Sequence, residues 1–176
     1  MGLTPLTTGV ARHVRMVQKK ETLQELLAQR DSLMESRRRD IEAQIQAQIQ
    51  EHHLELHAEF YTSVHGASHR NRDRTSRQEI IRDHVYVGML LDQVFEDDNP
   101  ASDTAVALVA PGFGQIGYLS DSIADDIRQW AAEGNTTAVV TVSELTGGTD
   151  DKPTRGVNLL LRMYQVVESR PAPSGV

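Results

Sequence analysis

The stretch from residue 12 to residue 59 contains neither glycine nor proline, the two residues that interrupt helices most strongly. It is rich in Gln, Glu, Ala, Leu and Arg, which are all good helix formers. Apolar residues recur along it and just beyond it at spacings of mostly three, four or seven: Leu23, Leu27, Met34, Ile41, Ile45, Ile49, Leu56 and Phe60. The pattern predicts a long helix over residues 12–59 that carries one apolar stripe on a charged rod.

A helix of this length cannot bury a single narrow stripe against itself. Two arrangements would cover the stripe: a coiled coil with another chain, or a hairpin that folds back around residues 37–40. We therefore expect residues 12–59 to mediate self-association or to dock a partner protein, unless the segment is a hairpin. The basic side chains of the stretch are interleaved with Glu and Asp, which is typical of solvated helix faces.

Histidines near the end of this stretch raise the question of a metal site. His53 and His57 would lie one helical turn apart, a spacing at which two neutral imidazoles can share a metal ion. No third ligand is evident, although Glu51, Glu55 and Glu59 are near in sequence. We expect solvent-facing histidines here, and we predict no metal and no cofactor.

Beyond Phe60 the sequence changes to short β-prone runs separated by turn residues. Strands are expected near residues 60–64, 84–91, 104–109, 115–119, 136–145 and 157–167. One helix is expected to begin at the N-cap Ser120 and to end at Gly134. The prediction is an α+β chain: an N-terminal long helix or helical hairpin followed by a small OB-like antiparallel β-barrel with one clear helix. The expected parts are a flexible lead-in (1–11), a helical or coiled-coil segment (12–59), the barrel domain (60–167) and a flexible tail (168–176).

The charge of the chain is unevenly distributed. The net charge is −7, yet residues 64–84 hold five basic and three acidic side chains, whereas residues 85–176 hold five basic and thirteen acidic ones. A protein that binds long nucleic acids through their phosphates usually has a broad basic surface. Any contact with nucleic acid is therefore expected to be local, in a groove formed by the arginines of the loop at residues 68–77: Arg70, Arg72, Arg74 and Arg77.

The cellular setting follows from what the sequence lacks. There is no cysteine, which excludes disulfides and thiolate chemistry. No apolar run approaches the roughly 20 residues that span a bilayer, and the first residues do not have the order of a secretory signal. A cytoplasmic protein without membrane contact is expected.

Four stretches resemble motifs of the HIRAN domain family, in the same order. The segment Ser63–Arg70 is similar to the family's opening strand, in which a glycine precedes a polar or aromatic pair. The segment Asp98–Leu108 looks like its Asn-Pro turn and the strand that follows, and Ile116–Ala124 is similar to its Gly-Tyr-Leu motif and helix. The segments at 146–148 and 156–161 resemble the closing hairpin of bacterial members. The resemblance covers about residues 60–167.

The resemblance implies a modified OB-like barrel and, for some members, capture of the 3′-hydroxyl end of single-stranded DNA. Asn99 matches the asparagine before the proline, where it holds a sugar or backbone oxygen or caps the turn. His69 and Arg70 stand at the polar and aromatic pair, and Tyr118 matches the third motif; each can stack on a base. The family's aromatic and aspartate after the proline are here Ala101 and Ser102 if no gap is placed, whereas a one-residue shift puts Asp103 at the aspartate position.

No recognisable catalytic motif occurs in the sequence. The glycines Gly112, Gly114 and Gly117 have the spacing of a dinucleotide loop, but they lie between two expected strands rather than before a helix. We predict a non-catalytic module that binds nucleic acid, either a single strand or a 3′ end, alone or as a subunit of a nucleoprotein complex. The alternative is a protein-interaction or assembly component whose barrel has lost the DNA-end pocket. The choice between DNA and RNA is left open.

Overall fold

The N-terminal part of the chain is one continuous helix. The computed structural model describes residues 8–134 and 136–167, with side chains from residue 21 onward, and α1 (Thr8–Glu51) spans 44 residues. The hairpin alternative around residues 37–40 is wrong, because good helix formers continue without a break on both sides. The helix begins at Thr8, before the predicted residue 12. Gly9 does not prevent this, because it lies in the first turn, where the backbone N–H groups have no helical partners. Residues 1–7 and the predicted tail at 168–176 lie outside the described residues.

The predicted end of the helix at Glu59 is wrong. The helix ends at Glu51, His53 adopts a φ of +50°, and β1 (Leu54–Ser63) follows. The strand β1 pairs along its length with β6 (Gly156–Val166), so hydrogen bonds to a distant segment override the local helix propensity. His53 and His57 are consequently not one helical turn apart, and no group of three potential metal ligands occurs among the described residues.

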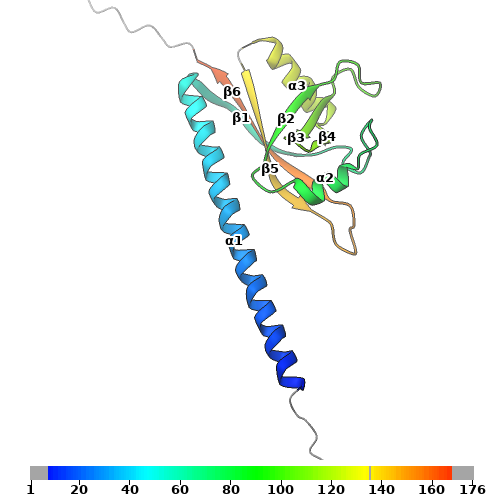
Figure 1. Ribbon diagram of the computed structural model, residues 1–176. Helices are drawn as coiled ribbons and strands as arrows, with labels where there is room; N and C mark the ends of the chain where they lie inside the picture. The colour runs from blue at the N-terminus through cyan, green and yellow to red at the C-terminus, as the bar shows by residue number, and fades with distance from the viewer. Residues whose placement is uncertain (1–7, 135, 168–176) are drawn as a thin grey trace, which may run out of the picture. The chain divides into compact units, whose positions relative to one another are not determined.

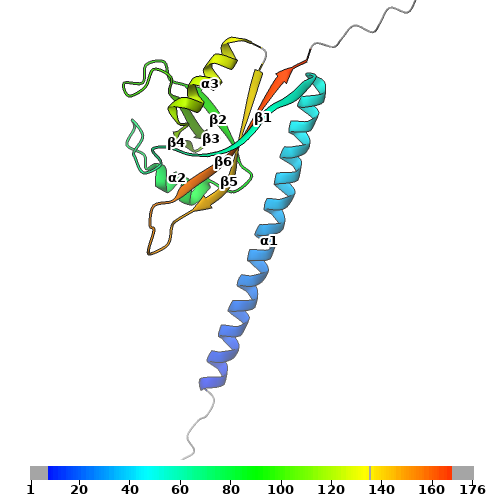
Figure 2. The ribbon, with the colours of Figure 1, turned by 180° about the vertical axis from the view of Figure 1, so that it is seen from behind.

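The chain divides into two compact units, Met1–Gln46 and Ala47–Val176, and the second contains all the strands. Six antiparallel strands form a sheet in the order β1-β6-β5-β2-β3-β4 (Figures 1 and 2). The remaining strands are β2 (Leu90–Phe95), β3 (Val106–Ala110), β4 (Gly114–Tyr118) and β5 (Thr136–Thr146). The predicted fold class, a long helix followed by a small OB-like antiparallel barrel, is confirmed.

Two helices accompany the strands. The predicted helix is α3 (Asp121–Ala132), with Ser120 at its N-cap position. A second helix, α2 (Arg77–His84), was not predicted, and the strand expected at residues 84–91 is wrong in its bounds, because α2 includes His84 and β2 begins only at Leu90. Its signal is the sequence Ser-Arg-Gln-Glu at residues 76–79, since the Ser76 hydroxyl accepts a hydrogen bond from the backbone N–H of Glu79. Ile80 and Ile81 then bury its apolar face.

The two outer strands of the sheet meet at one point. The backbone N–H and C=O of His65, just after β1, both bond to Tyr118 at the end of β4, each at 2.9 Å. This close approach requires glycine at position 117, because a Cβ there would overlap the His65 carbonyl and the Val64 side chain, and its φ is +155°. The bridge closes the sheet into a barrel on the side where β4 leads into α3.

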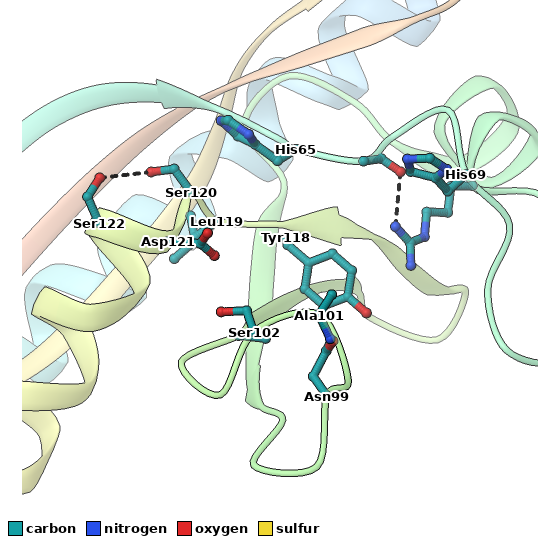
Figure 3. Close-up of a pocket in the computed structure, with 13 residues that line it drawn as sticks. His65, His69, Asn99, Ala101, Ser102, Tyr118, Leu119, Ser120, Asp121 and Ser122 are labelled. Atoms are coloured by element: carbon teal, nitrogen blue, oxygen red, sulfur yellow. Dashed lines mark hydrogen bonds between the residues drawn. The ribbon is translucent and has the colours of Figure 1, made fainter.

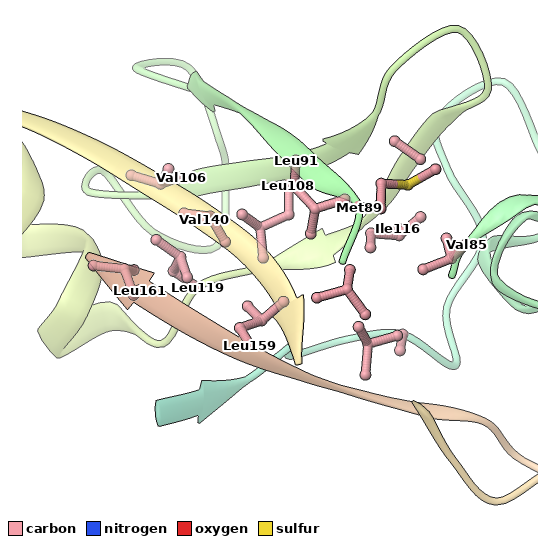
Figure 4. Packing of buried hydrophobic residues seen from close by; sticks show 14 of the residues in the cluster. Val85, Met89, Leu91, Val106, Leu108, Ile116, Leu119, Val140, Leu159 and Leu161 are labelled. Carbon is pink, nitrogen blue, oxygen red and sulfur yellow. The ribbon is translucent and has the colours of Figure 1, made fainter. Parts of the chain in front are cut away.

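The core of the barrel is made of alternating inward residues. In β6 every second residue is buried from Val157 to Met163, and β3 and β5 contribute Val106, Leu108, Val140 and Val142 (Figure 4). Ile81 from α2 and Ile127 from α3 join the same cluster, so both helices are anchored to the barrel. Among the described residues no helix is long and apolar enough to cross a membrane.

Candidate nucleic-acid interface

A cleft of about 700 Å³ lies beside the closure of the barrel. It is formed by the segment after β1, by the turn that precedes β3, and by the junction of β4 with α3 (Figure 3). Four of the seven predicted site residues line it, namely His69, Arg77, Asn99 and Tyr118. The other lining residues are His65, Gly66, Ala101, Ser102, Ala105, Leu119, Ser120, Asp121 and Ser122. The cleft therefore brings together residues from three separate parts of the sequence.

Arg77 is the one charged side chain that is buried among the described residues, with 5% of its surface exposed. Its Nε donates to the side-chain oxygen of Asn71 at 2.6 Å, and its Nη1 donates to the carbonyl of Gly66 at 2.9 Å. The guanidinium also lies over the ring of Tyr118, with Cζ 4.9 Å from the ring centroid. These fixed groups hold the guanidinium at the wall of the cleft rather than in the open groove that was predicted.

The positions of these groups follow from local sequence. Gly66 has a φ of +68°, which turns its carbonyl toward the arginine. Asn71 closes a turn with Thr75, and its side-chain amide also donates to the carbonyl of Gln115 in β4 at 2.9 Å. The loop that carries Asn71 is therefore tied to both α2 and β4.

Asn99 caps its own turn. Its side-chain oxygen accepts from the backbone N–H of Ala101 at 2.9 Å, and its amide donates to the carboxylate of Glu96 at 2.7 Å. The same Glu96 oxygen accepts from the Tyr118 hydroxyl at 3.1 Å. Of the two roles considered for Asn99, the turn cap is the one that its contacts display, and Glu96 links it to Tyr118.

The other three predicted arginines lie outside the cleft lining. Arg70, Arg72 and Arg74 are exposed on the loop between His69 and α2. Arg70 donates to the carbonyl of Arg74 at 2.9 Å, and Arg72 lies 3.6 Å from the Asp98 carboxylate. The structure does not bring the four arginines into a single groove, because Arg77 lies apart from the other three in the cleft lining, where its Nε and Nη1 make buried hydrogen bonds.

The loop that carries these arginines has a carboxylate at its tip. The side chain and the backbone N–H of Thr75 both donate to Asp73, at 2.6 Å and 2.9 Å. These hydrogen bonds, the side-chain one first, lower the pKa of Asp73 below its ordinary value. The bonds stabilise the turn that leads into Ser76 and α2.

Several lining residues have no signal in the sequence. No ligand contact was predicted from the sequence for His65, Ser102 or Ser122, and only folding brings them to one cleft. Ser120 was predicted as a helix cap, yet its hydroxyl makes no capping bond and instead lies 3.4 Å from that of Ser122. Asp121 supplies the one carboxylate of the lining.

Comparison with known proteins gives two similar structures. No family model and no curated protein matches the chain. The HIRAN domain of human HLTF is similar over 64% of this chain and 79% of that one, at 12% identity with a TM-score of 0.48. A protein from Lactobacillus plantarum is similar over 60% of this chain and 98% of that one, at 16% identity with a TM-score of 0.42. The first of these domains is of the family that the four sequence motifs resemble.

Proposed function

We propose that the barrel is a non-catalytic module that binds a single nucleic-acid strand, or its end, in the cleft beside Tyr118. The observation that carries this proposal is the convergence of His69, Asn99 and Tyr118 on one cleft from three separate motifs. The sequence motifs that resemble a strand-binding family already suggest a ligand contact at each of these three positions.

The chemistry of the lining suits a nucleotide. Tyr118 and His69 supply flat rings on which a base can stack, a contact worth about 1–3 kcal/mol per base. The cleft volume of about 700 Å³ lies in the ordinary range of small-ligand sites. Ser102, Ser120 and Ser122 add hydroxyls that can donate to or accept from sugar and phosphate oxygens.

The charge distribution favours a short contact. Residues 85–176 carry five basic and thirteen acidic side chains, so a long phosphate backbone laid across this surface would be repelled. A strand that enters only with its last nucleotides avoids most of this repulsion. We therefore favour binding of a strand end over binding along a continuous strand.

The test is a fluorescence anisotropy titration of the full chain with labelled single strands of DNA and of RNA at low salt, with free and with blocked 3′ ends. His69→Ala is expected to weaken binding at least tenfold, whereas His52→Ala, which changes an exposed histidine outside the cleft, leaves it unchanged. Equal affinity of both variants would remove the cleft from consideration. Absence of binding by the unchanged protein would remove the function.

A second candidate function is assembly through α1. The exposed leucines of this helix favour it, because Leu23 and Leu26 are each 57% exposed and Leu33 is 64% exposed. Water-exposed leucines on a 44-residue helix are typical of a surface that another helix covers. Self-association or a partner protein would then use α1 while the barrel acts as a scaffold.

A further inference from the structure

The buried charge of Arg77 has no counter-charge in the described part of the chain. Arg30, Arg72, Arg82, Arg128 and Arg162 each form an ion pair with a carboxylate. All of these are more exposed than Arg77, which forms none. Burying an unpaired charge is costly, whereas an exposed arginine gains little from a partner. Among the described residues, Arg77 is stabilised by neutral acceptors and a tyrosine ring alone, so its positive charge remains for an anionic ligand to neutralise.

One nitrogen of this guanidinium remains available. Nε and Nη1 donate to Asn71 and Gly66, while Nη2 makes no hydrogen bond within the described residues. No buried side-chain nitrogen or oxygen in this part of the chain lacks a partner, so the unbonded Nη2 is not sealed inside the protein. Arg77 lines the cleft, and Nη2 is the guanidinium nitrogen that no bond within the described residues occupies.

The rest of the lining is rich in donors. His65 and His69 offer imidazole rings, and Ser102, Ser120 and Ser122 offer hydroxyls that lie within hydrogen-bond distance of neighbouring hydroxyls. The lining contains one carboxylate, that of Asp121, which is exposed, so water and salt screen its negative charge. Such a set fits an anion with several acceptor oxygens better than it fits a neutral hydroxyl group.

We propose that the cleft recognises a terminal phosphate monoester at the end of a nucleic-acid strand, with Arg77 as its charge partner. This inference rests on the proposed function of the same cleft. A phosphate monoester carries a charge of about −1.5 to −2 at neutral pH and three acceptor oxygens. An internal phosphodiester carries a single charge and has two free oxygens. The planar guanidinium matches phosphate geometry, and charge-assisted hydrogen bonds of this kind are roughly twice as strong as neutral ones.

The experiment compares one short oligonucleotide in three forms, with hydroxyls at both ends, with a 3′-phosphate, and with a 5′-phosphate. Each carries an internal fluorophore and is titrated with the full chain at constant ionic strength. The Kd of at least one phosphorylated form is expected to be about tenfold lower than that of the hydroxyl form. The form that gains identifies the end that enters. Equal Kd values for all three would overturn the phosphate inference and leave the proposed function standing, whereas no binding of any form would overturn both.

Variants then connect the preference to the cleft. Arg77→Lys keeps the charge but loses the planar fork, and it is expected to reduce the phosphate preference to less than about threefold. Arg82→Gln, on the exposed face of the same helix, is the matched control and keeps the preference. Since Arg77→Lys also disturbs the bonds to Gly66 and Asn71 and thus folding, His69→Ala provides a second variant at an exposed position, with the same expected loss of preference.

A third measurement needs no variant. Inorganic phosphate is expected to displace a bound phosphorylated strand from the unchanged protein at concentrations where chloride of equal ionic strength does not. Displacement by both salts alike would show that only general screening acts, and would overturn the inference.

Discussion

The guanidinium of Arg77 lies over the ring of Tyr118, with its Cζ 4.9 Å from the ring centroid, while the hydroxyl of the same tyrosine donates to Glu96 at 3.1 Å. Tyr118 also bonds through its backbone to His65. One residue therefore contacts three walls of the cleft: the start of α2, the turn before β3 and the segment after β1. Its ring and its hydroxyl have separable roles.

Tyr118→Phe removes the hydroxyl and keeps the ring. We expect the free energy of unfolding to fall by about 1 kcal/mol, because one hydrogen bond to Glu96 is removed, with little change in strand affinity. Tyr118→Leu removes the ring as well and is expected to weaken strand binding about tenfold, since a stacking platform is gone. Urea denaturation and anisotropy measure the two effects. The control is Tyr61→Phe, at an exposed tyrosine outside the cleft. If this variant lost as much free energy of unfolding as Tyr118→Phe, the loss could not be assigned to the Glu96 contact.

Gly117→Ala tests the closure of the barrel. An added Cβ would overlap the carbonyl of His65, so we expect a loss of more than about 1 kcal/mol in the free energy of unfolding. Gly112→Ala is the matched control, because Gly112 also has a positive φ, +80°, but has open space around its missing Cβ. Both variants place alanine at a positive φ, so both carry backbone strain, but only Gly117→Ala adds the overlap with the His65 carbonyl. Equal losses by urea denaturation would show that the close approach to His65 contributes nothing.

Arg70→Glu combined with Arg72→Glu tests the exposed arginines of the loop. If they bind phosphates, the pair should weaken single-strand binding at least tenfold at low salt, and the slope of log K against log salt should fall by about 0.7 for each phosphate that is no longer neutralised. Arg82→Glu combined with Lys152→Glu changes the net charge equally at exposed positions outside the cleft. A matching loss in this second pair would indicate a general charge effect instead of a local groove.

The turn at Asp73 is expected to depend on pH. Because its pKa is lower in the folded protein than its ordinary value of 3.8, the hydrogen bonds to Thr75 stabilise the fold fully above that value. This contribution is lost as the pH falls through the lowered pKa. Amide hydrogen exchange of Thr75, corrected for its intrinsic pH dependence, should report protection that disappears in this acidic range. Asp73→Ala should lack the protection at every pH, and a persistent pH-dependent step in that variant would contradict the assignment.

The leucines of α1 give a test of assembly. Leu23→Glu combined with Leu27→Glu is expected to lower the molar mass measured by light scattering, if the apolar stripe joins copies of the chain, because charged residues would face each other across the contact. Gln24→Glu, between the two leucines, changes the charge of the helix without changing the stripe. A monomeric unchanged protein would exclude self-association and leave a partner protein as the occupant of the stripe.

Sequence alone predicted the elements whose cues are local. The strands β3 to β6 and the helix α3 were placed to within two residues, because turn residues such as Gly112, Gly134 and Pro111 mark their ends. The start of β1 was missed because its partner β6 lies about a hundred residues away in the chain, and no local pattern reports that pairing. Local helix propensity favoured the wrong state there.

The candidate site was predicted only in part for the same reason. His69, Asn99 and Tyr118 each lie in a sequence motif that can be recognised without knowing the fold. All three residues line one cleft. Arg77 was predicted to be a groove residue beside other arginines, whereas its burial depends on Gly66 and Asn71, which approach it only in the folded chain. Charge and spacing along the sequence do not distinguish a buried arginine from its exposed neighbours.

The short pairing of β2 with β5 gives the barrel two seams. Among the described residues, Leu90 and Leu91 of β2 pair with β5, with Gly88 and Met89 extending the contact by backbone hydrogen bonds to Val142, and on the opposite side His65 forms an isolated bridge with Tyr118. The barrel is thus two three-stranded halves, β1-β6-β5 and β2-β3-β4, and the cleft lies at the seam that Tyr118 closes. A ligand that contacts both sides of this seam is linked thermodynamically to its closure, so it raises the free energy of separating the halves by RT ln(1 + L/Kd), where L is the free ligand concentration. Occupancy of the cleft should therefore be measurable far from the ligand, as slower opening of the whole barrel.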